Sequence, residues 1–250
     1  MSAHLQIDDV AISFNGFKAV DGLSLKVNKG ELRCLIGPNG AGKTTALDLI
    51  CGKVRPSSGS IVYKGEELSK REDYRIARAG IGRKFQIPSV FKQLTVRENL
   101  EVAYCKRTGV IANLFQWSHS SDSEGLSKLA EFVGLSDHLN EPAEYLSHGQ
   151  TQWLEIALLL AQDAELILLD EPTAGMTVQE TRKTADICIR LKGKHTIIVV
   201  EHDMGFVKEI GDVISVMHQG KLLAEGTVAE IENDPRVRQV YLGSAGISGA

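Results

Sequence analysis

Gly37-Pro38-Asn39-Gly40-Ala41-Gly42-Lys43-Thr44-Thr45 is the stretch that decides the fold. A short apolar run, Cys34-Leu35-Ile36, precedes it, and the helix-period segment Ala46-Leu47-Asp48-Leu49-Ile50 follows it. The order is therefore strand, glycine-rich turn and helix. The spacing fits G-x-x-x-x-G-K-[ST], a loop that binds the phosphates of a nucleotide. We expect a nucleoside triphosphate to contact all nine residues.

Each residue type in this loop has a physical role. Glycines let successive backbone N–H groups turn inward toward an anion, and the N-terminus of the next helix adds the positive end of its dipole. Lys43 supplies a mobile positive charge for the β- and γ-phosphates. The Thr44 hydroxyl is placed to bind the Mg²⁺ that accompanies the nucleotide. A tight turn that merely holds a surface lysine requires none of these in combination.

The composition bounds the class of protein. The chain has 250 residues, 43% hydrophobic and 24% charged, as in a soluble globular protein, with a net charge of −4. This balance argues against nucleic acid as a partner. No apolar run approaches the ~18 residues of a membrane span, and the N-terminus has no signal-peptide pattern. Four cysteines without C-x-x-C spacing indicate reduced thiols in a cytosolic protein rather than a metal site.

Periodicity along the chain predicts one α/β domain. Leu5–Ser13 and Leu23–Val27 alternate as strands do and predict an antiparallel β layer, and Val213–Gly226 predicts a hairpin. The pattern is helical from about residue 87 to 163, apart from a variable loop expected at Ile111–Gly125. We predict a nucleotide-binding core with its β layer at residues 1–86 and 164–250, and a helical insert at 87–163.

Polar residues end several apolar runs. Leu166-Ile167-Leu168-Leu169 predicts a central parallel strand and ends in Asp170-Glu171. Because ligands collect at the carboxyl ends of parallel strands, Asp170 is available to Mg²⁺, and Glu171 is placed to accept a proton from an attacking water. His202 follows another apolar run and is placed to contact the γ-phosphate. Gln86, at the end of a short predicted strand, is placed to reach Mg²⁺ or the attacking water.

Two further features indicate nucleotide binding only when they are read together with the motifs above. Leu146-Ser147-His148-Gly149-Gln150 opens a long predicted helix, in which Ser147 suits the N-cap and Gly149 permits close approach of an anion to the free N–H groups. Read alone, this stretch is an ordinary capped helix. Phe14 lies near a strand end, where it either stacks on an adenine ring or joins the core.

In this order and spacing, the motifs resemble those of the ATP-binding subunits of ABC transporters over essentially the whole chain. GPNGAGKTT is similar to the Walker A motif, Gln86 to the Q-loop glutamine, LSHGQ to the signature motif and LILLDE to Walker B with its glutamate. Ala174–Thr177 falls at the D-loop and His202 at the switch histidine. His148 replaces the usual glycine of the signature, the D-loop lacks its usual aspartate, and Phe14 stands where tyrosine is frequent.

The resemblance implies ATP and Mg²⁺ as cofactors, with hydrolysis coupled to transport. It implies a second ATP-binding subunit, identical or a close paralogue, so that each ATP lies between the P-loop of one chain and Ser147, Gly149 and Gln150 of the other. Transmembrane permease subunits would dock near Gln86 and the insert. The chain would thus be peripheral on the inner face of the plasma membrane, with a periplasmic substrate-binding protein as an indirect partner.

The tail LLAEGTVAEIENDPRVRQVYLG is similar to that of ATPases of branched-chain amino-acid importers. LSHGQTQWLEIALLLAQD, DEPTAGMT and VVEHDMGFV look most like the urea-importer member of that group, so the sequence predicts urea uptake. Branched-chain amino-acid import and lipopolysaccharide export stay open. Of the non-transport alternatives, a DNA-linked ABC ATPase would carry heptads or zinc pairs, and a P-loop GTPase would carry an N-K-x-D motif. Neither pattern is evident.

Overall fold

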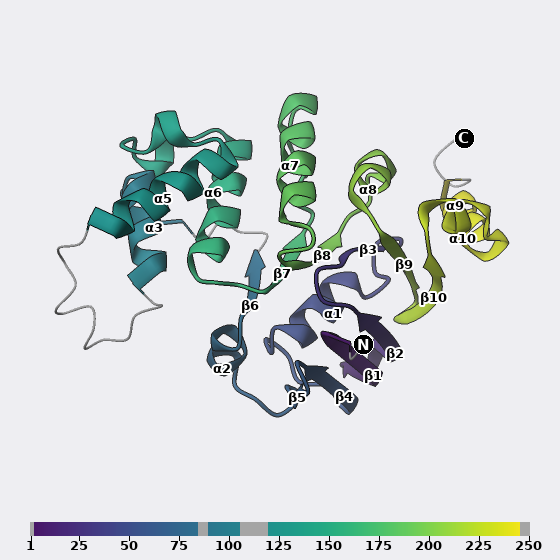
Figure 1. Cartoon of the computed structure of the whole chain (residues 1–250). Coiled ribbons are helices and arrows are strands. Elements are labelled where there is room, and N and C mark those ends of the chain that lie inside the picture. Colours follow the sequence, from purple (N-terminus) through teal and green to yellow (C-terminus); the bar gives the residue numbers. More distant parts are fainter. Residues whose placement is uncertain (1–2, 85–89, 106–119, 246–250) are drawn as a thin grey trace.

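The computed structural model describes residues 3–84, 90–105 and 120–245 (Figure 1). Two sheets form its centre. One has four antiparallel strands in the order β2-β1-β4-β5, and the other has six strands in the order β10-β9-β3-β8-β7-β6. The strands are β1 (Leu5–Phe14), β2 (Phe17–Val27), β3 (Leu32–Ile36), β4 (Ser58–Tyr63), β5 (Glu66–Glu67), β6 (Ile81–Lys84), β7 (Leu166–Asp170), β8 (Thr196–Val200), β9 (Val213–His218) and β10 (Lys221–Gly226).

The helices pack on both faces of the larger sheet. Those between β6 and β7 gather on one side of the molecule, α9 and α10 lie at the opposite side, and α7 stands between α6 and α8 (Figure 1). They are α1 (Lys43–Ile50), α2 (Asp73–Arg78), α3 (Val96–Cys105), α5 (Ser120–Val133), α6 (His148–Ala161), α7 (Val178–Leu191), α8 (Met204–Ile210), α9 (Val228–Asn233) and α10 (Pro235–Ala245), with single 3-10 turns η1 (Ser136–His138) and η2 (Ala143–Tyr145).

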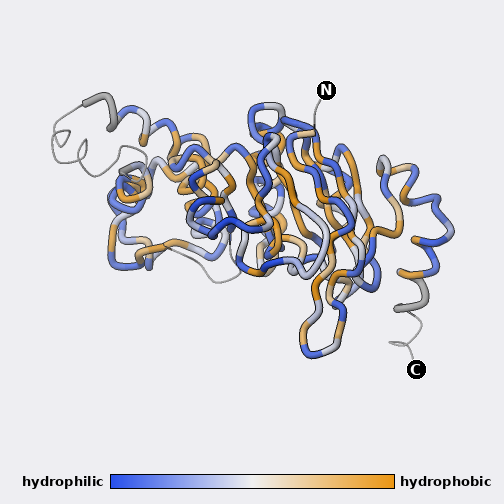
Figure 2. The backbone as a smooth tube through the Cα atoms, turned by 90° about the horizontal axis from the view of Figure 1, so that it is seen from below, coloured by the Kyte–Doolittle hydropathy of each residue, from blue (hydrophilic) through white to orange (hydrophobic). Residues whose placement is uncertain are grey.

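Five strands of the larger sheet, from β9 to β6, run parallel, and β10 is the antiparallel edge. All residues of β3, β7 and β8 are buried, as expected for parallel strands covered on both faces. Hydrophobic residues accordingly run through the strands at the centre of the molecule (Figure 2). Because these strands are parallel and adjacent, the segments that follow β3, β7 and β8 meet at one edge of the sheet.

Two apolar cores hold the layers together. One lies between the two sheets and includes α1 residues such as Leu47 and Ile50; the other joins the larger sheet to α3, α5, α6, α7 and α8. Side chains of α7 also bind the segment between β6 and β7. The Trp153 indole donates to the Thr184 hydroxyl (3.0 Å), and the Lys183 ammonium lies 3.8 Å from the centre of the Trp153 ring.

The predicted antiparallel layer and the Val213–Gly226 hairpin are confirmed, and the strand ends differ by a few residues. The predicted loop at Ile111–Gly125 is wrong for its last part, because α5 begins at Ser120; residues 111–119 lie outside the described chain. Leu126, Ala130 and Val133, all in the C-terminal part of α5, are buried and anchor the helix in the apolar core. Its first turns therefore need no apolar pattern of their own.

The second strand also starts earlier than predicted, at Phe17 instead of Leu23, because β1 pairs with it along its whole length. The division into core and insert stays a prediction. Cys34 and Cys188 are buried free thiols and Cys51 is partly exposed. No helix in the described ranges is long and apolar enough to cross a membrane.

Candidate functional site

The glycine-rich loop joins β3 to α1, as the sequence predicts. Gly42 has φ 99°, and a Cβ built there would lie 2.4 Å from the Ala19 carbonyl oxygen, so only glycine fits. The start of β2 thus packs directly on the loop. The turn between β9 and β10 packs on it as well, because the Gly220 N–H donates to the Ala41 carbonyl (3.0 Å). The loop is therefore shaped by segments from both ends of the chain.

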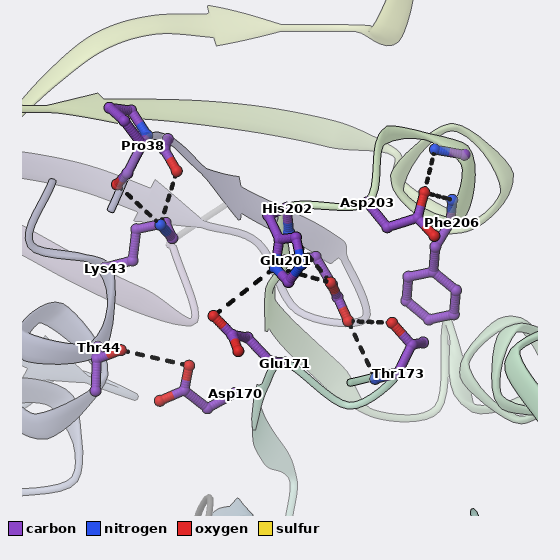
Figure 3. A network of polar contacts seen from close by, with 12 residues as sticks. Pro38, Lys43, Thr44, Asp170, Glu171, Thr173, Glu201, His202, Asp203 and Phe206 are labelled. Atoms are coloured by element: carbon purple, nitrogen blue, oxygen red, sulfur yellow. Dashed lines mark hydrogen bonds and ion pairs between the residues drawn. The ribbon is translucent and has the colours of Figure 1, made fainter. Parts of the chain in front are cut away.

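Lys43 is the first residue of α1, and its side chain folds back into the loop. It is buried, and its ammonium donates to the carbonyl oxygens of Gly37 (2.7 Å) and Pro38 (3.1 Å) (Figure 3). Burial lowers the pKa of Lys43, while the charges of Glu171 and Asp170 oppose that shift. The ammonium is thus held at the loop that the sequence predicts to bind phosphate.

Thr44 and Asp170 come together from α1 and the end of β7. The Thr44 hydroxyl lies 3.5 Å from Asp170 Oδ1, and the other carboxylate oxygen pairs with Arg83 at 3.2 Å. Burial raises the pKa of Asp170, and the Arg83 charge opposes that shift. A hydroxyl and a single carboxylate fit Mg²⁺, which takes few protein oxygens and fills its shell with phosphate and water. No cluster of three ligating side chains occurs in the part of the chain that the structure describes.

The side chains of Glu171 and His202 face each other next to Thr44 and Asp170 (Figure 3). Glu171 has φ 47°, uncommon for a non-glycine residue, and its N–H is fixed by the Val200 carbonyl at 2.9 Å. The Glu171 Oε1 lies 3.8 Å from His202 Nδ1. About a third of the Glu171 side chain and 64% of the His202 side chain are exposed, so both are open to a ligand and to water.

Sequence reasoning missed two residues that support this edge. Glu201 is buried and accepts hydrogen bonds from the Thr173 N–H (3.1 Å) and hydroxyl (2.7 Å), which ties the segment after β7 to the end of β8. Arg83 is buried between Asp48 and Asp170. For Glu201 the available signal was a charged residue directly after the apolar strand β8, since such a charge, when buried, requires a partner. Arg83 lies in Ile81-Gly82-Arg83-Lys84, which offers no such signal.

The LSHGQ stretch begins α6, and its hydrogen bonds do not run to the P-loop of the same chain. Ser147 is the N-cap and accepts from the Gln150 N–H, while the Gln150 side chain accepts from the Ser147 N–H (2.8 Å). The Ser147 hydroxyl donates to Glu180 Oε1 (2.9 Å), and His148 Nε2 lies 3.0 Å from the Ala174 carbonyl oxygen. The predicted signature residues therefore lie together and bond to α7 and to the segment before it, rather than to the predicted phosphate site.

Phe14 ends β1 and is 45% exposed, so it is not a core residue. It pairs across the hairpin with Phe17, which is 65% exposed and lies on the same face. Two residues farther on, Ala19 contacts the loop at Gly42. The structure thus offers two aromatic rings near the loop where the sequence indicated one. Gln86 lies outside the described residues, so its predicted contact stays a prediction.

Comparisons with known proteins agree with this arrangement. The family model described as "ABC transporter" matches residues 20–174, and "Branched-chain amino acid ATP-binding cassette transporter" matches residues 221–247. The chain is 38% identical over 250 residues to the high-affinity branched-chain amino acid transport ATP-binding protein LivG of Salmonella typhimurium, covering 96% of this chain and 98% of the relative. It is 37% identical, with the same coverage, to BraF of Pseudomonas aeruginosa.

Solved structures show the same relationship. The ADP conformation of MJ1267, an ATP-binding cassette of an ABC transporter, superposes with a TM-score of 0.85 at 31% identity, covering 97% of this chain and all of that one. A nucleotide-free cassette gives 0.83 at 30% identity and covers 96% of this chain and 99% of the other. The predicted P-loop α/β fold with its antiparallel layer is thus confirmed. This chain belongs to the ABC transporter family, as an ATP-binding subunit of the LivG and BraF type.

Proposed function

We propose that this chain hydrolyses ATP to power the import of branched-chain amino acids through separate membrane subunits. The observation that carries the substrate class is the match of residues 221–247 to the branched-chain amino acid cassette element, together with the names of the similar relatives. The urea prediction made from the sequence has no such support among these relatives. Branched-chain amino acids, its stated alternative, therefore become the proposed cargo.

The residues at the sheet edge divide the chemistry between them. Lys43 and the N–H groups of the loop hold the phosphates, and the Thr44 hydroxyl and Asp170 hold Mg²⁺, which, when bound, neutralises charge on the phosphates. Glu171 orients a water and accepts its proton. His202, whose Nδ1 faces Glu171, directs a ring N–H toward the γ-phosphate. The positive φ of Glu171 sets the direction in which its carboxylate points. The backbone strain of this conformation is offset by the stability of the rest of the fold.

We propose that a second ATP-binding subunit completes each site. The support is that the Ser147 hydroxyl binds Glu180 of α7 within one chain and makes no hydrogen bond to the P-loop of that chain. Two chains packed head to tail bring the N-terminus of α6 from one to the phosphates held by the other. ATP then favours the closed pair by its differential affinity for that state.

The permease subunits dock, in this proposal, over a groove of about 470 Å³ between α2, β6, α3 and α6. Three of its lining residues are exposed apolar side chains: Tyr74 at 51%, Phe91 at 57% and Val102 at 40%. Exposed apolar groups in a groove are typical of a protein-binding surface. Docking there holds the chain at the inner face of the membrane. A periplasmic binding protein delivers the cargo to the permease at the opposite face.

An uptake experiment tests the cargo. The gene is deleted from its own host, and labelled leucine and labelled urea uptake are each measured at low concentration. Loss of leucine uptake, restored by the wild-type gene and not by Glu171→Gln, supports the proposal. Normal leucine uptake with loss of urea uptake overturns the branched-chain assignment and supports the urea prediction made from the sequence.

A further inference from the structure

The carboxylate of Glu180 lies between the N-termini of two helices. Glu180 is the third residue of α7, and its Oε2 accepts hydrogen bonds from the Thr177 N–H and hydroxyl, each at 2.9 Å. Its other oxygen, Oε1, accepts the Ser147 hydroxyl at the start of α6, also at 2.9 Å. One oxygen therefore caps its own helix, and the other reaches the signature motif.

The contact with α6 is close. A Cβ built on Gly149 would lie 2.4 Å from Glu180 Oε1, so the carboxylate lies directly against the backbone of the second residue of that helix. Hydrogen bonds from Thr177, Ser147 and the Gly149 backbone lower the pKa of Glu180, which keeps it ionised. Among the described residues, none of the ion pairs involves Glu180. Its charge therefore lies against the N-termini of α6 and α7, without a cation of its own among the described residues.

A helix N-terminus binds one anion readily because its free N–H groups and its dipole favour negative charge. Under the proposed function, on which this inference rests, the anion at α6 in the closed pair is the γ-phosphate held by the partner chain. We propose that Glu180 is an internal anion that occupies this position in the separate chain and must leave it when two chains close on ATP. Glu180 thereby sets the affinity of ATP-driven pairing.

The geometry allows Oε1 to leave without unfolding α7. The two hydrogen bonds from Thr177 go to Oε2, so the capping box of α7 keeps its partners when the contact with Ser147 breaks. The negative charge, however, stays near the phosphate after the contact has broken. Like charges in an interface oppose association, so removing this charge should tighten the pair.

The chain contains a matched control. In α9, Glu230 Oε2 accepts from the Thr227 N–H (2.7 Å) and hydroxyl (2.9 Å), which is the same capping box without a second helix. Glu230→Gln therefore removes the same charge from the same local structure, away from α6. Glutamine in either position keeps an oxygen that accepts the cap hydrogen bonds.

The test uses Glu171→Gln as the parent, because slow hydrolysis leaves ATP in place. The dissociation constant of the pair is measured by sedimentation velocity in MgATP for the parent, for parent with Glu180→Gln, and for parent with Glu230→Gln. We expect Glu180→Gln to lower the constant at least about fivefold and Glu230→Gln to leave it unchanged. The gain should shrink when NaCl is raised from about 50 to about 500 mM, because salt screens the repulsion. Circular dichroism checks that both variants fold.

Three results overturn the proposal, and they are distinguishable. Equal or weaker pairing in Glu180→Gln, with a parent that pairs, shows that Glu180 is a helix cap only. Equal tightening by Glu230→Gln shows that net charge alone controls pairing. If the Glu171→Gln parent stays monomeric in MgATP, the proposed function is wrong about the shared site, and Glu180 has no pairing to regulate.

Discussion

Thr44 and Asp170 are 126 positions apart in the chain, yet the Thr44 hydroxyl lies 3.5 Å from Asp170 Oδ1. The parallel pairing of β3 with β8, and of β8 with β7, brings the two segments to one edge of the sheet. Each residue carries an oxygen of the kind that Mg²⁺ prefers as a ligand. This pair is the structural basis of the first prediction.

Asp170→Asn should raise the Mg²⁺ concentration needed for half-maximal ATPase activity at least about tenfold, because a neutral amide attracts the cation less than a carboxylate does. The measurement is a Mg²⁺ titration at fixed ATP. Asp137→Asn, at an exposed position in η1, is the control and should leave the titration unchanged. An unaltered Mg²⁺ requirement in Asp170→Asn would contradict the assignment.

Lys43→Ala should reduce ATP turnover by about 10²-fold or more, because it removes the positive charge held inside the loop and leaves the backbone intact. ATP binding should weaken as well, which equilibrium dialysis measures. Lys128→Ala on the exposed face of α5 serves as control, since that side chain is 70% exposed. Turnover close to wild type in Lys43→Ala would rule out the phosphate role of this loop.

Glu171→Gln should slow hydrolysis by about 10²–10⁴-fold, because the amide has the shape of the carboxylate without its ability to accept the proton. ATP binding should persist, so the variant should run as a dimer with MgATP and as a monomer without it. Adding Ser147→Arg should abolish that dimer and spare ATP binding, because the bulky side chain blocks the partner's phosphate. Size-exclusion chromatography with light scattering decides both points, in the presence of a paralogue if one is the natural partner. A dimer that survives Ser147→Arg would exclude α6 from the shared site.

Phe14→Ala should weaken ATP binding by about 1–3 kcal/mol, the usual contribution of one base stacked on an aromatic ring. Binding of tripolyphosphate, which has no base, should not change. Calorimetry with both ligands separates stacking from a general disturbance of the loop. Phe17→Ala is the competing variant, because Phe17 lies opposite Phe14 and is more exposed. A loss confined to Phe17→Ala would move the base to that ring.

Arg83→Leu should lower the free energy of unfolding by about 3–5 kcal/mol, because it leaves the buried Asp170 carboxylate without its cation. Urea denaturation measures the change. Arg55→Leu breaks an ion pair in which both side chains are about 60% exposed, and it should cost no more than about 0.5 kcal/mol. Equal effects of the two substitutions would show that Arg83 has no special role.

Much of the fold was accessible from sequence because its signals are local. The continuous apolar run 166–169 predicts a buried strand, and Gly42 with Lys43 predicts the loop, whatever the rest of the chain does. The start of α5 was not accessible, since Ser120–Gly125 has no apolar repeat and depends on anchors farther along the helix. The partners of Arg83 and Glu201 were not accessible either. Their partners Asp170 and Thr173 are brought to them by the sheet, and no spacing in the chain encodes those contacts.

The turn between β9 and β10 gives the loop a link to the tail of the chain. Gly220, whose N–H binds the Ala41 carbonyl, immediately precedes the segment 221–247 that carries the subfamily element. The most general motif of the chain and its most specialised one are therefore neighbours in space, joined by a backbone hydrogen bond. A change that distorts this turn should therefore disturb the phosphate loop as well, so the first residues of the tail are mechanically coupled to the nucleotide site.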